Sequence, residues 1–146
     1  MTNNYDQLSA LVEKFYVLER DTELREFACW VAAQTYPSFE SHRNILKTIS
    51  SELEYPRHMS KVLYNTREEF KGTAIAAGTV GMRHAPQSAA SFLACFACAE
   101  EDSYHAARKA VLYACQWYRE TIDSDDDEVF VKHLVDKLTA IWARQE

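Results

Sequence analysis

Apolar residues recur every three or four positions along most of the chain, which is the period of an amphipathic α-helix. Asp21 is placed to cap a helix N-terminus, and Pro37 disfavours the helical conformation in the residue before it. Four helices are predicted in the first half of the chain. The first covers about residues 4–19, and the second runs from Asp21 to Tyr36. The third holds Ile45, Ile49 and Leu53 and stops before Pro56, and the fourth, which is shorter and more polar, covers residues 57–71.

The character of the chain changes between Thr73 and Ala114, where thirteen alanines occur together with Gly78 and Gly81. Small side chains let helix axes approach closely, so this half is predicted to form the centre of the fold. Three further helices are expected here and beyond. One helix begins at Pro86, and its inward face is predicted to consist of Ala89, Phe92, Leu93, Phe96 and Ala97. The next is capped by Asp102. The last starts in the acidic run 125–128, and its apolar stripe consists of Phe130, Leu134, Leu138, Ile141 and Trp142.

No segment alternates with period two for long enough to predict a strand, and the 146 residues contain only three glycines and three prolines. Turn-rich sandwiches and barrels need far more of both. The sequence therefore predicts an all-α fold: a single-domain bundle of about seven helices over residues 1–146, with an Ala/Gly-rich centre. A chain of this length can bury a sufficient core without metal or disulfide bonds.

The formal net charge is −6, which argues against direct nucleic-acid binding because that function depends on Lys and Arg at the phosphates. Charge is also unevenly spread. Nine acidic and three basic residues lie between Glu100 and Glu128, whereas residues 57–83 carry five bases and two acids. The acidic part is therefore a candidate surface for a basic protein partner.

The candidate partner-binding patch combines acidic side chains after position 119 with two aromatic residues just before them. Aromatic side chains beside a charged rim are typical of protein–protein hot spots. An alternative interpretation is a solvated loop that also caps the last helix, with Trp117 in the core. The residues of this predicted patch are Trp117, Tyr118, Glu120, Asp123, Asp125, Asp126, Asp127 and Glu128.

The four cysteines, Cys29, Cys95, Cys98 and Cys115, lie in apolar helical patterns, which predicts buried free thiols and a reducing cytoplasm. The N-terminus has no secretory pattern, and no apolar stretch is long enough to span a bilayer, so no membrane association is expected. Cys95 and Cys98 form a CxxC in the middle of a predicted helix. Since no second cysteine pair exists, packing is favoured over zinc or redox chemistry.

No catalytic residue, metal site or cofactor is predicted. The histidines are expected on helix surfaces. A di-iron bundle requires paired Glu-x-x-His sequences on facing helices. The carboxylates closest in spacing, Asp102 or Glu101 before His105 and Glu54 before His58, do not form such a pair. Glycine-rich phosphate loops and Gly-x-Ser-x-Gly are absent.

The stretch Leu24–Ala33, with its Arg-x-Phe-Ala-Cys pattern at Arg25–Cys29, and the Ala-rich run through His105–Ala110 resemble a family of all-helical immunity proteins that accompany bacterial polymorphic toxins. The resemblance covers about residues 20–120. This chain departs from it at Gly78 and Gly81, where alanine often continues, and the acidic run matches no family motif. The resemblance implies a protein that binds a cognate toxin stoichiometrically and blocks it. An acidic inhibitor would suit a basic toxin domain.

Two other functions stay open from the sequence alone. The same bundle could serve as another interaction module, such as a phage or host-defence adaptor or inhibitor. A helical metal-dependent enzyme is the third interpretation. The sequence predicts neither the oligomeric state nor which helices are neighbours.

Overall fold

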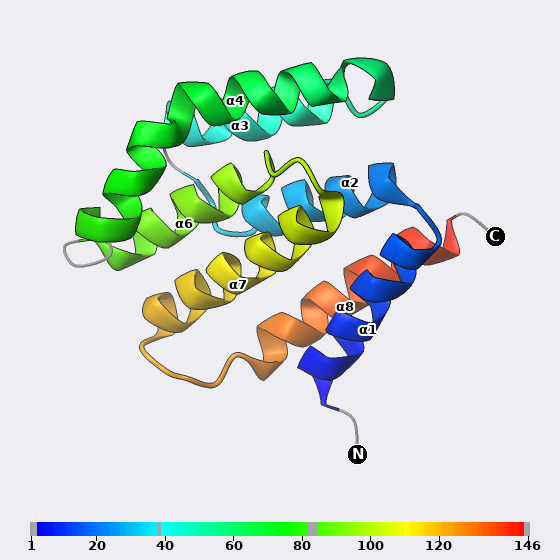
Figure 1. Cartoon of the computed structure of the whole chain (residues 1–146). Coiled ribbons are helices and arrows are strands. Elements are labelled where there is room, and N and C mark those ends of the chain that lie inside the picture. Colours follow the sequence, from blue (N-terminus) through cyan, green and yellow to red (C-terminus); the bar gives the residue numbers. More distant parts are fainter. Residues whose placement is uncertain (1–2, 38, 82–84, 145–146) are drawn as a thin grey trace.

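The computed structural model describes residues 3–37, 39–81 and 85–144, which form seven α-helices and one π-helical turn with no strand (Figure 1). The predicted all-α bundle is therefore confirmed. The elements are α1 (Asn4–Val17), α2 (Asp21–Ala33), α3 (Glu40–Ser51), α4 (Pro56–Ala76), the π-turn η1 (Ala77–Gly81), α6 (Pro86–Ala97), α7 (Ser103–Ile122) and α8 (Glu128–Ala143).

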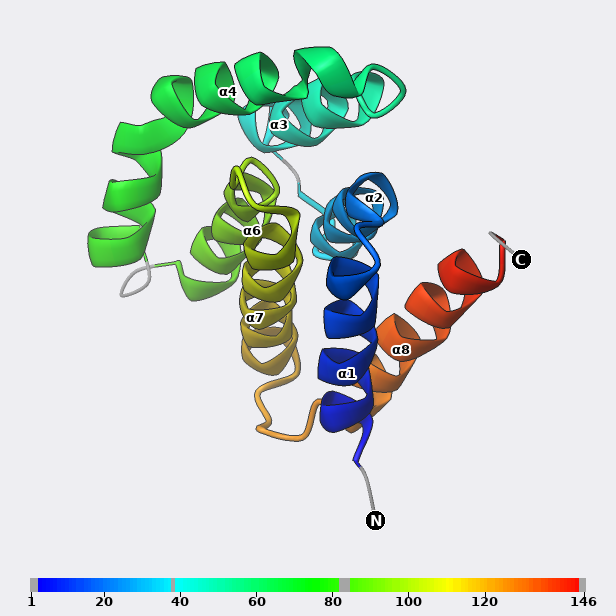
Figure 2. The same ribbon diagram turned by 45° about the vertical axis from the view of Figure 1, so that its right-hand side comes forward.

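The helices surround the antiparallel pair α6 and α7, which makes the most extensive packing contact in the fold (Figures 1 and 2). Helix α2 packs on α7, and α1 and α8 lie side by side next to them. Helices α3 and α4 form a separate layer that covers α2 and α6 (Figure 2). No described helix is both long and apolar enough to cross a membrane.

Small side chains fill the contact between α6 and α7, as the composition predicts. Alanine at these positions allows close axis approach with little loss of side-chain entropy. The alanines of the two helices that are 5% exposed or less are Ala89, Ala90, Ala94, Ala97, Ala106, Ala107, Ala110 and Ala114.

The prediction of a central position is wrong for most of residues 73–79, of which Ala74 and Ala77 alone pack against the core. Thr73, Ile75 and Ala76 are exposed, and a Cβ added at Gly78 would meet nothing within 4 Å. Helix α4 is also longer than predicted, because no proline follows Pro56 until Pro86 and the Ala-rich stretch continues the helix. Its second half bends toward the start of α6, where η1 packs (Figure 2).

Two predicted helix starts agree with the structure, but the cap predicted at Asp21 is wrong: α2 begins at Asp21 itself, its N-cap residue is Arg20, and the Asp21 carboxylate accepts from Ser103 instead. Pro86 occupies the first turn of α6, and Asp102 caps α7 by accepting from the Tyr104 amide. Helix α2 ends at Ala33 rather than at Tyr36. The reason is local: the Thr35 hydroxyl donates to the Ala32 carbonyl at 2.6 Å, and Tyr36 adopts the left-handed region with φ 48°.

Arg20 links the first and last helices. Its guanidinium lies 4.6 Å from the Phe15 ring centroid and 4.4 Å from that of Trp142. It also donates to the carbonyl oxygens of Ile141 and Trp142 near the end of α8. Cation–π contacts and charged hydrogen bonds thus fix the α1–α2 turn against α8.

Candidate protein-binding surface

The acidic residues between Glu100 and Glu128 do not form one surface. Glu100, Glu101 and Asp102 precede α7, whereas the remaining six follow Tyr118 at its other end. A helix of 20 residues is about 30 Å long, so the two groups lie at opposite ends of α7. Each group therefore needs its own assessment.

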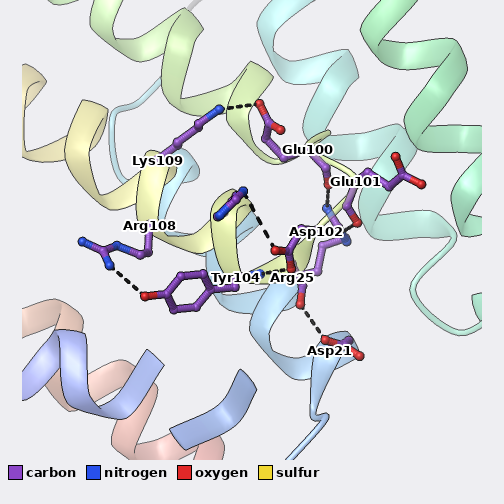
Figure 3. Close-up of polar contacts among 10 residues, drawn as sticks. Asp21, Arg25, Glu100, Glu101, Asp102, Tyr104, Arg108 and Lys109 are labelled. Atoms are coloured by element: carbon purple, nitrogen blue, oxygen red, sulfur yellow. Dashed lines mark hydrogen bonds and ion pairs between the residues drawn. The ribbon is translucent and has the colours of Figure 1, made fainter. Parts of the chain in front are cut away.

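The first group belongs to a hydrogen-bonded turn between α6 and α7 (Figure 3). Arg25 is 5% exposed and donates to the carbonyl oxygens of Cys98 and Glu100, both at 2.7 Å, and of Glu101 at 2.9 Å. Arg67 donates to the Ala99 carbonyl at 2.8 Å. These carbonyls end a helix and have no partner within it, so the two arginines satisfy them.

Side chains of the same turn are also paired (Figure 3). Asp21 accepts from the Ser103 hydroxyl at 2.7 Å, and Glu100 forms an ion pair with Lys109 at 2.8 Å. Burial lowers the pKa of Arg25, opposed by nearby groups that include Asp21. The Arg-x-Phe-Ala-Cys pattern at Arg25–Cys29 therefore has a structural explanation: its arginine holds the α6–α7 turn.

The cysteines are buried, as predicted, but the CxxC lies at the end of α6 rather than in its middle. Cys98 is the C-cap residue, and its thiol donates to the Ala94 carbonyl. Burial raises the pKa of Cys95 to about 12, and that of Cys115 also to about 12. A reactive thiol needs the opposite environment, with a helix N-terminus or nearby cation lowering its pKa.

The histidines follow the prediction at three positions and contradict it at one. His58, His105 and His133 are exposed, and His84 lies outside the described residues. His42 is buried instead, with its ring 4.7 Å from that of Phe92. The described ranges contain no group of three or more His, Cys, Asp or Glu side chains placed to hold a metal ion.

The second acidic group, at the end of α7, combines paired and unpaired carboxylates. Arg119 forms an ion pair with Asp127 at 2.7 Å. The N-cap residue of α8, Asp127, makes no side-chain cap hydrogen bond, but Asp126 just before it accepts from the Glu128 amide at 3.2 Å and so satisfies the first amide of the helix. Glu128 accepts from the Asn4 side chain at 3.1 Å.

Three carboxylates of this group are exposed and engage no other described side chain: Glu120, Asp123 and Asp125. Asp123 ends α7 in the left-handed region, with φ 52°. We call Glu120, Asp123, Asp125 and Asp126 the acidic rim, because Asp126 is also exposed and uses only one oxygen in its cap.

The two predicted aromatic residues have different environments. Tyr118 stacks on Phe130 with ring centroids 4.8 Å apart, so it joins α7 to the start of α8. Trp117 is half-buried, 6.3 Å from Phe130 on one side and 6.0 Å from Tyr36 on the other. Both residues are partly exposed, and Trp117 also lines a cleft that another molecule could enter.

Trp117 lines a cleft of about 270 Å³ between the α2–α3 connection, the start of α6 and the end of α7. We call it the Trp117 cleft. Tyr36 and Phe39 form its outer wall and are 78% and 55% exposed. Its lining residues are Thr35, Tyr36, Phe39, His42, Ala85, Gln87, Ser88, Ser91 and Trp117.

The cleft and the acidic rim are adjacent. Glu120 follows Trp117 by three positions on α7, which places both on one side of the helix. Gln87 also lines the cleft and donates to the Glu120 carbonyl at 3.4 Å. Tyr36, Phe39 and His42 were not predicted as site residues, because only the fold brings the α2–α3 connection and the start of α3 beside α7.

Three larger clefts each have at least one charged side chain in their lining, and the smallest of them, of about 300 Å³, contains Glu69 and Phe70. One of about 460 Å³ contains Asp21 and Arg25, and one of about 430 Å³ contains Tyr104, Arg108 and Lys109. In the latter, Arg108 donates to the Tyr104 hydroxyl at 2.7 Å. The Trp117 cleft differs from these in its own lining, which holds four aromatic rings, Tyr36, Phe39, His42 and Trp117, and no Lys, Arg, Asp or Glu side chain.

Comparison of the chain with protein-family models, with curated proteins and with solved structures finds no match. The resemblance to immunity proteins rests on the sequence patterns alone.

Proposed function

We propose that this chain is a non-catalytic cytoplasmic binding protein, specifically an immunity protein that neutralises a cognate bacterial toxin by forming a stoichiometric complex with it. The observation that carries the proposal is the adjacency of the acidic rim and the Trp117 cleft. Exposed Tyr36 and half-buried Trp117 supply large apolar contact area, and the carboxylates around Glu120 supply charge.

This combination suits the physical task of an inhibitor. Aromatic side chains that become buried in a complex contribute most of the binding energy and slow dissociation. Unpaired charge at the edge accelerates association with a surface of opposite sign. Toxins that degrade nucleic acid present basic clefts to their substrate, so an acidic partner would cover such a cleft.

The test uses the toxin domain encoded beside this protein's gene in the native genome. Cells that express the domain alone should stop growing, and co-expression of this chain should restore growth. Purified together, the two proteins should elute as a complex of fixed stoichiometry, with a dissociation constant measurable by calorimetry. A toxin domain with its catalytic residue replaced should bind equally, because inhibition by docking does not need turnover.

Two results would contradict the proposal. One is that no gene for a toxin lies beside this one, while the chain binds a protein of unrelated function. The other is that growth returns without a complex, since that would mean the chain acts on the toxin's product rather than on the toxin.

A further inference from the structure

The three tryptophans of the chain differ in what covers their rings. Lys137 lies 5.3 Å from the ring centroid of Trp30, and Lys14 and Arg20 lie 4.3 and 4.4 Å from that of Trp142. Among the described residues, the ring–ring contacts of Trp117 are with Tyr36 and Phe130, and no lysine or arginine of those ranges lies over its ring. The indole rings of Trp30 and Trp142 are thus each covered by a lysine or arginine of the same chain, whereas the Trp117 ring lines an open cleft without such a cation.

The remaining walls of the Trp117 cleft also suit a cation. The Tyr36 and Trp117 rings are tilted by 58° to each other, and the ring centroids of Phe39 and His42 lie 5.2 Å apart. Aromatic faces are electron-rich, so rings that surround a cleft from several directions attract a positive group. Burial lowers the pKa of His42, which keeps its imidazole neutral near pH 7 and adds no opposing charge.

The floor of the cleft offers a hydrogen-bond acceptor. Thr35 and Ser91 both line it and are 2% and 5% exposed. The Thr35 hydroxyl donates to the Ala32 carbonyl at 2.6 Å, so the 2.7 Å contact between the two hydroxyls is donated by Ser91. Ser91 then has no proton left to give, and its oxygen can only accept.

The charges near the cleft are predominantly negative. Glu120 lies beside it, and Asp123 and Asp125 follow with no partner among the described side chains. Of the nearby bases, Arg119 is neutralised by its ion pair with Asp127, whereas Arg43 donates to the Pro37 carbonyl and keeps its charge. Three carboxylates, those of Glu120, Asp123 and Asp125, still outnumber this one arginine, so the local field favours a cation from outside.

We propose that the Trp117 cleft receives the guanidinium group of an arginine side chain from a basic protein partner. This inference rests on the proposed function and specifies what its partner presents. A volume of about 270 Å³ lies below the range of about 300–1,000 Å³ that encloses drug-sized ligands, and it suits one long side chain. Arginine is favoured over lysine because its planar group stacks on aromatic rings and donates in several directions at once.

The first experiment needs no partner. The protein labelled with ¹⁵N is titrated with acetyl-arginine amide and, separately, with acetyl-citrulline amide, which is the neutral analogue of nearly the same shape. The indole N–H signals of Trp30, Trp117 and Trp142 are followed, and the Trp117 signal is assigned with a Trp117→Phe variant. Arginine should shift the Trp117 signal saturably, at millimolar concentration or above, and citrulline should not.

Trp30 and Trp142 serve as internal controls because each already has a cation at its ring. Equal shifts of all three indoles, or none, would overturn the proposal. If the citrulline compound bound as tightly as the arginine compound, the cleft would recognise apolar shape and not charge, which would also overturn the proposal. Tighter binding of acetyl-lysine amide than of the arginine compound would refute the assignment to arginine.

The second experiment separates this inference from the proposed function. Tyr36→Ala removes the most exposed wall of the cleft, and Tyr64→Ala removes an exposed tyrosine of α4 that does not line the cleft. If the toxin complex forms, Tyr36→Ala should weaken it about threefold to thirtyfold, and Tyr64→Ala should not change it.

The outcomes are distinguishable. A complex that both variants leave unchanged refutes the arginine site and keeps the immunity function. Arginine binding at Trp117 without any toxin complex refutes the immunity function and keeps the site.

Discussion

The guanidinium of Arg25 donates to the Cys98 carbonyl at 2.7 Å across 73 positions of sequence. The same group reaches the Glu100 and Glu101 carbonyls, so one buried side chain of α2 holds the end of α6 and the turn into α7. Because α6 and α7 form the central pair, this contact connects a local cap with the core of the bundle.

Replacing Arg25 by lysine should therefore lower stability although the charge is kept. Lysine cannot match the forked geometry, and at least one buried carbonyl loses its partner. We expect a decrease of roughly 2 kcal/mol in the free energy of unfolding, measured by urea denaturation. Arg57→Lys, at an exposed position of α4, should stay near wild type. Equal stability of the two variants would show that the three carbonyl bonds contribute nothing net.

The acidic rim should determine the rate of association rather than the fold. Asp123, Asp125 and Asp126 can each become Asn without structural loss, since Asn tolerates the left-handed conformation at 123 and still accepts the amide bond at 126. The triple variant should associate with the toxin domain roughly tenfold more slowly at low salt and with a weaker salt dependence, measured by stopped flow.

Asp127→Asn is the matched control, because Asp127 is paired with Arg119 and is less exposed than the rim. This variant should change stability by less than about 1 kcal/mol and leave the association rate close to wild type. An unchanged rate in the triple variant at low salt would count against the rim as the contact surface.

His42 should make stability depend on pH. Burial lowers the pKa of His42 below its ordinary value of 6.5, so the folded protein resists protonation that the unfolded chain accepts. The contribution of neutral His42 to the free energy of unfolding is fully present above pH 6.5, and it is lost as the pH falls through the lowered pKa of His42 in the folded protein. Thermal unfolding of wild type and His42→Phe between pH 8 and pH 5 checks this. The stability difference between the two proteins should move in favour of the variant toward acid, and a constant difference would refute it.

The cysteines of the CxxC should act through packing. Cys95→Ala and Cys98→Ala should each cost on the order of 1 kcal/mol of stability, as small core truncations do, and should leave partner binding unchanged. Reaction with a thiol reagent should need unfolding, because Cys95 and Cys98 are 0% exposed. Loss of a stoichiometric metal ion in either variant would replace the packing interpretation with a metal site.

Hydrophobic periodicity was sufficient to predict the helices and their inward faces, because both depend on neighbours three or four positions apart. The limits appear where local side-chain bonds or packing decide the outcome. The end of α2 at Ala33 goes with the local bond from Thr35 to Ala32, and the exposed position of Gly78 depends on packing that the period does not encode. A count of charges along the sequence likewise could not reveal that α7 separates the acids into two groups.

The candidate site divides in the same way. Trp117 and the acidic residues after it were visible as neighbours in sequence. Tyr36 and Phe39 were not, because their position beside Trp117 depends on how α2, α3 and α7 pack. The tyrosine just before Pro37 was the one sequence feature that pointed to this side of the cleft, and it does not indicate which helix lies opposite.

The pairing of α1 with α8, secured by Arg20 at Trp142, has a consequence for synthesis. Helix α1 is synthesised before α8, so the part of its apolar stripe that packs on α8 stays uncovered until α8 has been made. During that interval the Phe15 ring, which is fully buried in the folded protein and lies 5.1 Å from that of Trp142, is open to water. This topology delays completion of the core until translation has passed α8.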